Sequence, residues 1–120
     1  MKILIIEDEP ILGKLYKKAL EKNGFLASWA SSGQEANKII KALIPDLFII
    51  DHGLQDTQNS GMDLLIVFKK AFPKAKFIML SNYNDADLRA KAIELGANDF
   101  LLKLNTSPAI LAQYIKKLFA

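Results

Sequence analysis

The sequence predicts an α/β fold, a doubly wound parallel sheet of five strands built from five consecutive strand–helix units, (βα)5. Two observations lead to this prediction. Short runs of apolar residues, which are typical of strands covered on both faces, alternate along the chain with longer segments of helical period. This alternation favours parallel strands joined by right-handed crossovers, with helices on both faces of the sheet.

Five apolar runs predict the strands. The runs are Ile3–Ile6, Leu26–Ala30, Leu47–Ile50, Phe77–Leu80 and Phe100–Leu102. Four of them are uninterrupted, as expected for strands that are buried on both faces. The second run is broken by Ser28, which favours a strand at the edge of the sheet.

Capping residues predict where the helices lie. Pro10 suits the first turn of a helix that runs to about Asn23 and ends at Gly24. Ser32 and Glu35 predict a capping box at the start of the second helix. The second helix is predicted to stop before Pro45. The third is predicted to begin at Ser60 and Asp63 and to end near Pro73, the fourth to run from Asp85 to Gly96, and the fifth to run from Ser107-Pro108 to Ala120.

The composition indicates a soluble protein of one domain. A chain of 120 residues with 51% hydrophobic residues can bury a core without further staples, so we expect residues 1–120 to form a single domain. Because the fifth helix is predicted to reach Ala120, this domain is also compatible with a fragment of a longer protein. No apolar stretch approaches the roughly 18 residues that span a membrane. The absence of cysteine excludes disulfides and suits a reducing cytoplasm, where we expect the protein to reside.

Lysines give the chain a net charge of +3. Lys14, Lys17 and Lys18 have the spacing of the outer face of one helix. A second group is close together in a later segment: Lys69, Lys70, Lys74 and Lys76. Neither group is accompanied by clustered arginines or interleaved aromatic residues. We therefore interpret both groups as solvated faces and expect no direct nucleic-acid binding.

Polar residues follow the predicted strands at their carboxyl ends, where ligands bind in open α/β sheets. The first strand is followed by Glu7-Asp8-Glu9, the third by Asp51, the fourth by Ser81 and the fifth by Lys103. Carboxylates gathered at one edge repel one another unless a cation joins them, and oxygen ligands with open positions suit Mg²⁺. A lysine and a serine can hold phosphoryl oxygens, so the pattern predicts phosphoryl transfer to a carboxylate.

Four strings resemble the receiver domains of two-component signalling, and together they extend over the whole chain: ILIIEDEP, PDLFIID, FIMLSN and AIELGANDFLLK. The resemblance implies the flavodoxin-like strand order 2-1-3-4-5. It also implies that Asp51 is the phosphoacceptor. Asp8 would bind Mg²⁺ directly, Glu7 largely through water, and the Gly53 carbonyl would be a further ligand.

The same resemblance assigns roles to three more residues and to the partners. Ser81 would hydrogen-bond the phosphoryl oxygens, Lys103 would pair with them, and Phe100 would be the aromatic switch. The phosphodonor would be a histidine kinase or a histidine phosphotransfer protein. An output domain or a second copy would use the surface of the fourth helix, fifth strand and fifth helix. A receiver catalyses only its own phosphorylation and dephosphorylation and is not otherwise an enzyme.

The chain departs from the receiver pattern at several places. Gln55 and Leu104 stand where prolines are usual, Asn82 stands where a small residue is common, and the loop from Asp51 to Gly61 is long. In receiver domains the bond between the lysine and the following proline is usually cis. A cis bond before a non-proline residue such as Leu104 costs about 2.5–4 kcal/mol, against about 0.5–1 kcal/mol before proline. We therefore predict a trans bond between Lys103 and Leu104, a changed path into the fifth helix, and a looser salt bridge from Lys103 to Asp51.

Three other functions share parts of this pattern. A receiver-like module that binds a partner without being phosphorylated is compatible with Asn82 and the long loop. A phosphatase of the haloacid-dehalogenase type needs a second aspartate where Gly53 stands, and an electron carrier of the flavodoxin type would meet repulsive acids after the first strand. His52 and Asp56 lie near Asp51, but we expect neither to be catalytic.

Overall fold

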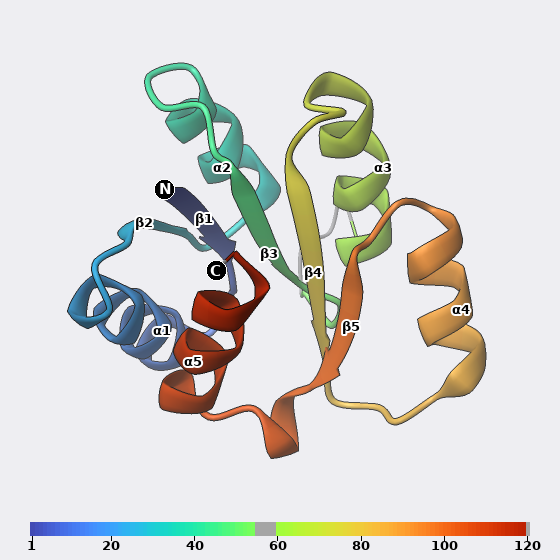
Figure 1. Ribbon diagram of the computed structural model, residues 1–120. Coiled ribbons are helices and arrows are strands. Elements are labelled where there is room, and N and C mark those ends of the chain that lie inside the picture. Colours follow the sequence, from blue (N-terminus) through green and yellow to red (C-terminus); the bar gives the residue numbers. More distant parts are fainter. Residues whose placement is uncertain (55–59, 120) are drawn as a thin grey trace.

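The protein is described from a computed structural model that covers residues 1–54 and 60–119. Its five strands form one parallel sheet in the order β2-β1-β3-β4-β5, as the resemblance implied (Figure 1). The strands are β1 (Lys2–Ile6), β2 (Leu26–Ala30), β3 (Leu47–Asp51), β4 (Lys76–Ser81) and β5 (Asp99–Leu102). The helices are α1 (Pro10–Lys22), α2 (Gly33–Ile40), α3 (Gly61–Ala71), α4 (Ala86–Glu94) and α5 (Pro108–Leu118), and a 3₁₀ turn, η1 (Lys103–Asn105), precedes α5.

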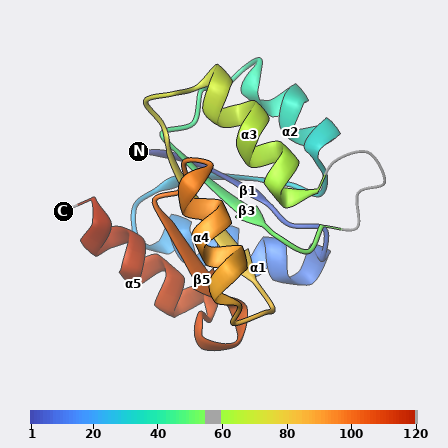
Figure 2. The same cartoon turned by 90° about the vertical axis from the view of Figure 1, so that its right-hand side faces the viewer.

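Helices cover both faces of the sheet. The helices α1 and α5 lie side by side on one face, and α2, α3 and α4 cover the other (Figures 1 and 2). Successive residues of β3 therefore enter different cores: Leu47 and Ile49 pack toward α1 and α5, whereas Phe48 and Ile50 pack toward α2 and α3. This alternation explains why β3 reads as a continuous apolar run, and it confirms the predicted fold class.

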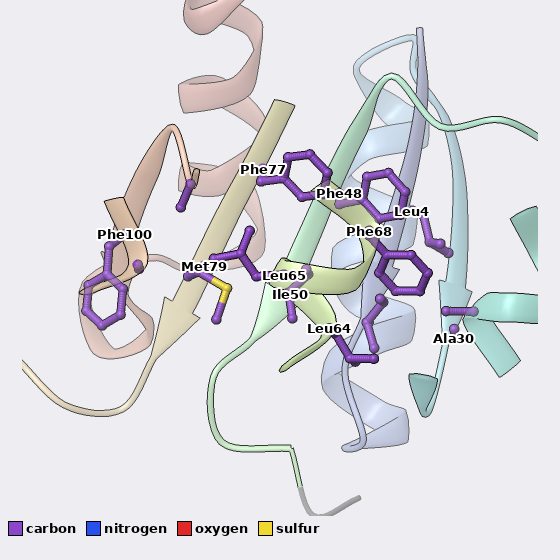
Figure 3. Close-up of a cluster of buried hydrophobic side chains, with 14 residues drawn as sticks. Leu4, Ala30, Phe48, Ile50, Leu64, Leu65, Phe68, Phe77, Met79 and Phe100 are labelled. Atoms are coloured by element: carbon purple, nitrogen blue, oxygen red, sulfur yellow. The ribbon is translucent and has the colours of Figure 1, made fainter. Parts of the chain in front are cut away.

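An aromatic stack fills the core beneath α3. The ring of Phe48 lies between those of Phe68 and Phe77, with centroid distances of 5.1 and 4.8 Å (Figure 3). All three side chains are buried. Rings of this size contribute much of the burial that holds a helix on a sheet, so the stack fixes α3 against β3 and β4.

The helix caps match the sequence with one exception. Ser60 and Asp63 form the predicted capping box of α3, and Asp85 caps α4 through two backbone N–H groups. The predicted capping box of α2 is wrong in its second half. The Ser32 hydroxyl accepts from Glu35 N as expected, but the Glu35 carboxylate accepts from the backbone N–H and hydroxyl of Ser31.

Three further predictions concern strand and helix ends. The strand broken by Ser28, β2, is an edge strand as predicted. The helix α5 ends at Leu118 instead of running to the last residue, because Phe119 already departs from helical backbone angles. The Lys103–Leu104 bond is trans, since residues 1–54 and 60–119 contain no cis peptide bond. No helix within these ranges is both long and apolar enough to cross a bilayer.

Candidate metal centre

Three carboxylates meet at the carboxyl edge of the sheet. One oxygen from each of Glu7, Asp8 and Asp51 lies within 4.8 Å of the other two. Glu7 is 2% exposed and Asp51 is 3% exposed, whereas Asp8 is half-buried. The structure thus brings together Glu7, Asp8 and Asp51, whereas Glu9, the third acid after β1, is exposed and is not part of the cluster.

The central strands explain why these acids converge. The strand β1 pairs with both β2 and β3, and the ladder with β2 continues to Glu7, whose N–H donates to Ala30 O at 3.0 Å. Asp51 is the last residue of β3 and is paired in register with Leu80 of β4. One oxygen of Asp51, Oδ1, accepts from the N–H of Gly53 at 2.9 Å, which closes a tight turn after the strand.

Lys103 lies between two of the carboxylates. Its Nζ is 2.7 Å from Glu7 Oε1 and 3.0 Å from Asp51 Oδ2. Lys103 therefore reaches Asp51 although the peptide bond that follows it is trans, as predicted. The expectation of a looser salt bridge stays a prediction, although the shorter of the two contacts is the one to Glu7.

The charges in the site are unbalanced. Burial, together with the hydrogen bond and charge of Asp51, raises the pKa of Glu7 to about 8, and Lys103 offsets only part of this effect. Burial lowers the pKa of Lys103, but its hydrogen bond to Glu7 and its contacts with Asp51 outweigh burial and leave that pKa raised. One ammonium group thus faces three carboxyl groups, and a cation bound among them would favour the ionised form of Glu7.

An open pocket of about 960 Å³ lies above this cluster. It is lined by Glu7, Asp8, Glu9, Leu12, Asp51, Gly53, Asn82, Lys103 and Leu104. Leu104 is 88% exposed, so the residue that replaces the usual proline stands at the rim. Asn82 is also exposed at this opening, and its effect on access stays a prediction.

Ser81 lies at the expected strand end, but its hydroxyl is directed elsewhere. The side chain is buried, and its Oγ accepts from Tyr83 N at 3.0 Å and donates to Tyr83 O at 3.3 Å. Ser81 is absent from the residues that line the pocket. Its predicted role therefore requires the β4–α4 turn to give up part of this bonding.

The rings of Phe100 and His52 lie next to each other. Phe100 is 6% exposed, and the His52 ring meets it edge-on at a centroid distance of 6.4 Å. The His52 Nδ1 is buried and has no hydrogen-bond partner among the described residues. His52 does not line the pocket, and the expectation that it is not catalytic stays a prediction. Gln55 and Asp56 lie outside the described residues.

Two side chains that the sequence did not single out hold the backbone of site residues. The Trp29 indole N–H donates to the carbonyl of Glu7 at 2.7 Å, and Arg89 donates to the carbonyl of Phe100 at 2.7 Å. Arg89 also pairs with Asp99 at 3.1 Å, and Tyr114 donates to the same carboxylate. No motif marks these residues, because their contacts depend on the assembled sheet.

Comparisons with known proteins point to one family. A family model for the response regulator receiver domain matches residues 3–115. The nitrogen assimilation regulatory protein NtrX of Azorhizobium caulinodans is 34% identical over 101 residues, and the photosynthetic apparatus regulatory protein RegA of Cereibacter sphaeroides is 33% identical over 101 residues. Both alignments cover 84% of this chain, but they cover 22% of NtrX and 53% of RegA. The chain thus spans about half or less of these relatives.

Solved structures show the same fold. The crystal structure of a response regulator from Thermotoga maritima matches with a TM-score of 0.84 at 29% identity, covering 98% of this chain and 95% of that one. A CheY-like receiver domain protein from Methanospirillum hungatei matches with a TM-score of 0.86 at 26% identity, covering 98% and 91%. With the family model spanning nearly its whole length, this chain belongs to the response regulator receiver domain family, the signalling modules of two-component systems.

Proposed function

We propose that the chain accepts a phosphoryl group on Asp51 from the phosphohistidine of a histidine kinase or histidine phosphotransfer protein, with Mg²⁺, in the cytoplasm. The observation that carries this proposal is the meeting of Asp51 with two further acidic side chains, Glu7 and Asp8, and with a lysine 3.0 Å from the acceptor. In the family, such a site belongs to a signalling module and not to a metabolic enzyme.

The donor set fits Mg²⁺. The available ligands are oxygens, and their charge exceeds that of Lys103, which are the conditions under which this ion binds through carboxylates and keeps waters. Asp8, Asp51 and the carbonyl of Gly53 would hold the ion directly, and Glu7 would hold it through water. When bound, Mg²⁺ supplies positive charge that neutralises the oxygens of the transferring phosphoryl group.

The residues of the chain position the acceptor. Asp51 forms the new oxygen–phosphorus bond, the nitrogen–phosphorus bond of the donor breaks, and the donor imidazole leaves and takes up a proton. The two oxygens of Asp51 are oriented separately, one by the N–H of Gly53 and the other by Lys103. Lys103 is also held by Glu7 at 2.7 Å, so it can pair with a phosphoryl oxygen while Glu7 keeps it in place.

Phosphorylation would act on the surface formed by α4, β5 and α5. Ser81 precedes α4, and Phe100 in β5 is bound through its carbonyl to Arg89 of α4. A phosphoryl group that engages Ser81 would shift an equilibrium between two arrangements of these elements. An output domain or a second copy would then read this surface.

The test is phosphorylation with acetyl phosphate or phosphoramidate in the presence of Mg²⁺, followed by peptide mapping of the acyl phosphate. Asp51→Asn should abolish the label. The matched control Asp46→Asn, which removes an exposed carboxylate whose Oδ2 accepts from Lys2 N at 2.8 Å, should leave the label unchanged. Label that persists in Asp51→Asn, for instance on Asp56, would contradict the proposal.

A second function is favoured by the orientation of Ser81. Because its hydroxyl is bonded to the backbone of Tyr83 and is absent from the pocket lining, the chain has features of a receiver-like module that binds its partner without phosphorylation. A correctly folded protein that binds Mg²⁺ but takes no phosphate from either small donor or from a histidine kinase would favour this second function.

A further inference from the structure

Trp29 lies beside the metal centre without belonging to the acidic cluster. It is half-buried in the edge strand β2, in register with Ile5 of β1. From there its indole reaches past the end of β1, and Nε1 donates to the carbonyl of Glu7 at 2.7 Å. This is a well-formed hydrogen bond by distance.

The bond restrains the peptide between the two acids. The N–H of Glu7 is already held by the carbonyl of Ala30 at 3.0 Å, so both peptide groups that flank the Cα of Glu7 are bound to β2. Because a peptide group is planar, fixing the Glu7 carbonyl also fixes the N–H and Cα of Asp8. Trp29 thereby limits how the Glu7 and Asp8 side chains can lie relative to each other.

Gly13 provides the space for this indole. A Cβ added at Gly13 would lie 2.2 Å from Nε1 of Trp29 and 2.5 Å from Cδ1, so no larger residue fits while the ring keeps its place. Gly13 is in the interior of α1, where glycine is less stable than alanine. The helix therefore carries an unfavourable residue at a position where the indole lies against it.

We propose that Trp29 is a positioning residue of the metal site: its indole N–H holds the Glu7–Asp8 peptide in the arrangement that binds Mg²⁺, and Gly13 allows the ring to reach it. The inference rests on the proposed function, since it assumes that this cluster binds Mg²⁺. A role in packing alone would lower the stability of the fold without changing the affinity of the folded protein for the metal.

The test compares Trp29→Phe with Phe25→Leu. The first substitution keeps an aromatic cover over α1 but removes the donor, and the second trims a half-buried side chain of the same core without touching the Glu7 carbonyl. Mg²⁺ is titrated against each folded protein while the amide NMR signal of Gly53 is followed, and urea unfolding is measured in parallel. We expect Trp29→Phe to weaken Mg²⁺ binding by about 3- to 10-fold, the effect of one hydrogen bond, and Phe25→Leu to leave the affinity unchanged.

Gly13→Ala gives an independent route to the same result, including the case in which Trp29→Phe does not fold. The added methyl group should displace the indole and weaken Mg²⁺ binding to a similar degree. The chain contains one tryptophan, so its indole N–H gives one NMR signal, whose exchange with solvent should accelerate in Gly13→Ala.

The outcomes separate the two proposals. Wild-type affinity for Mg²⁺ in both Trp29→Phe and Gly13→Ala would overturn the positioning role and leave the proposed function intact. A wild-type protein that binds no Mg²⁺ would overturn the metal site and the positioning role together. Weakened binding in both variants, with an unchanged Phe25→Leu control, would support the role of Trp29.

Discussion

We expect Glu7→Gln to stabilise the metal-free domain at pH 9 and to change its stability little at pH 4.5. Glu7 is 2% exposed beside Asp51, and its pKa is raised from 4.5 to about 8, first by burial and then by Asp51. Glutamine has nearly the same shape as glutamic acid but never ionises. The substitution therefore removes the energetic cost of a buried negative charge without creating a cavity.

The size of the effect follows from the pKa of Glu7. At about 1.4 kcal/mol for each unit of pKa, a rise from 4.5 to about 8 corresponds to about 5 kcal/mol. A carboxyl group with a raised pKa in the folded state stabilises the fold fully below pH 4.5 and loses that contribution as the pH rises through about 8. The free energy of unfolding of the wild type should therefore fall by about 5 kcal/mol across this pH interval. That fall is a large share of the roughly 5–15 kcal/mol typical of a domain.

Urea unfolding in EDTA between pH 4.5 and 9 measures this directly. The wild-type curve should fall with pH and that of Glu7→Gln should stay nearly flat, so that the two diverge toward pH 9. Mg²⁺ at 100 times its dissociation constant should return about 2.7 kcal/mol to the wild type at pH 9, because only the folded protein binds it. Parallel curves for the two proteins would show that Glu7 is not the group that carries the buried charge.

Three further predictions concern the metal, the switch and the α4–β5–α5 surface. Asp8→Ala should weaken Mg²⁺ binding by more than Glu7→Gln does. For Glu7→Gln we expect a roughly 10- to 100-fold loss of affinity, which is typical of residues that act on a metal through its surroundings. Equal losses in an NMR titration would contradict the division of roles. Beryllofluoride should shift the NMR signals of Ser81, Phe100 and the α4–β5–α5 surface, whereas changes limited to the loops around the acceptor would contradict a switch. Tyr114→Phe removes the donor to the Asp99 carboxylate, and it should lower the free energy of unfolding by about 1–2 kcal/mol; an unchanged urea midpoint would show that this bond contributes nothing to stability.

The strands and most helix ends could be predicted because they depend on neighbouring residues. A continuous apolar run such as Leu47–Ile50 is required wherever both faces of a strand are covered, and Ser60 with Asp63 can satisfy each other within one turn. The second half of the α2 capping box could not be predicted in the same way. The Glu35 carboxylate can accept from the N–H of either Ser31 or Ser32, which are adjacent in sequence. The geometry of the turn decides which of the two donates, and it favours Ser31.

The composition of the site could also be predicted, since parallel strands deliver their following residues to one edge. The partners of each side chain could not. The shorter contact of Lys103 with Glu7 than with Asp51 depends on where a long, flexible chain finds room, and no pattern in the sequence encodes it. The contact of Trp29 with Glu7 depends on the register between β1 and β2, which exists only in the assembled sheet.

The bonding of Ser81 has a consequence for the order of events after a ligand arrives at Asp51. A serine hydroxyl has one proton, and in this structure the proton is directed to the carbonyl of Tyr83 at 3.3 Å, a long bond. A ligand that accepts the hydrogen bond of this hydroxyl leaves the Tyr83 carbonyl unbonded to Ser81, while the hydroxyl can still accept from Tyr83 N. The first peptide released is then the one between Tyr83 and Asn84, next to the Asp85 that caps α4. Competition for the one hydrogen bond that Ser81 can donate would thus release the backbone that leads into α4 before any side chain in the core has to rotate.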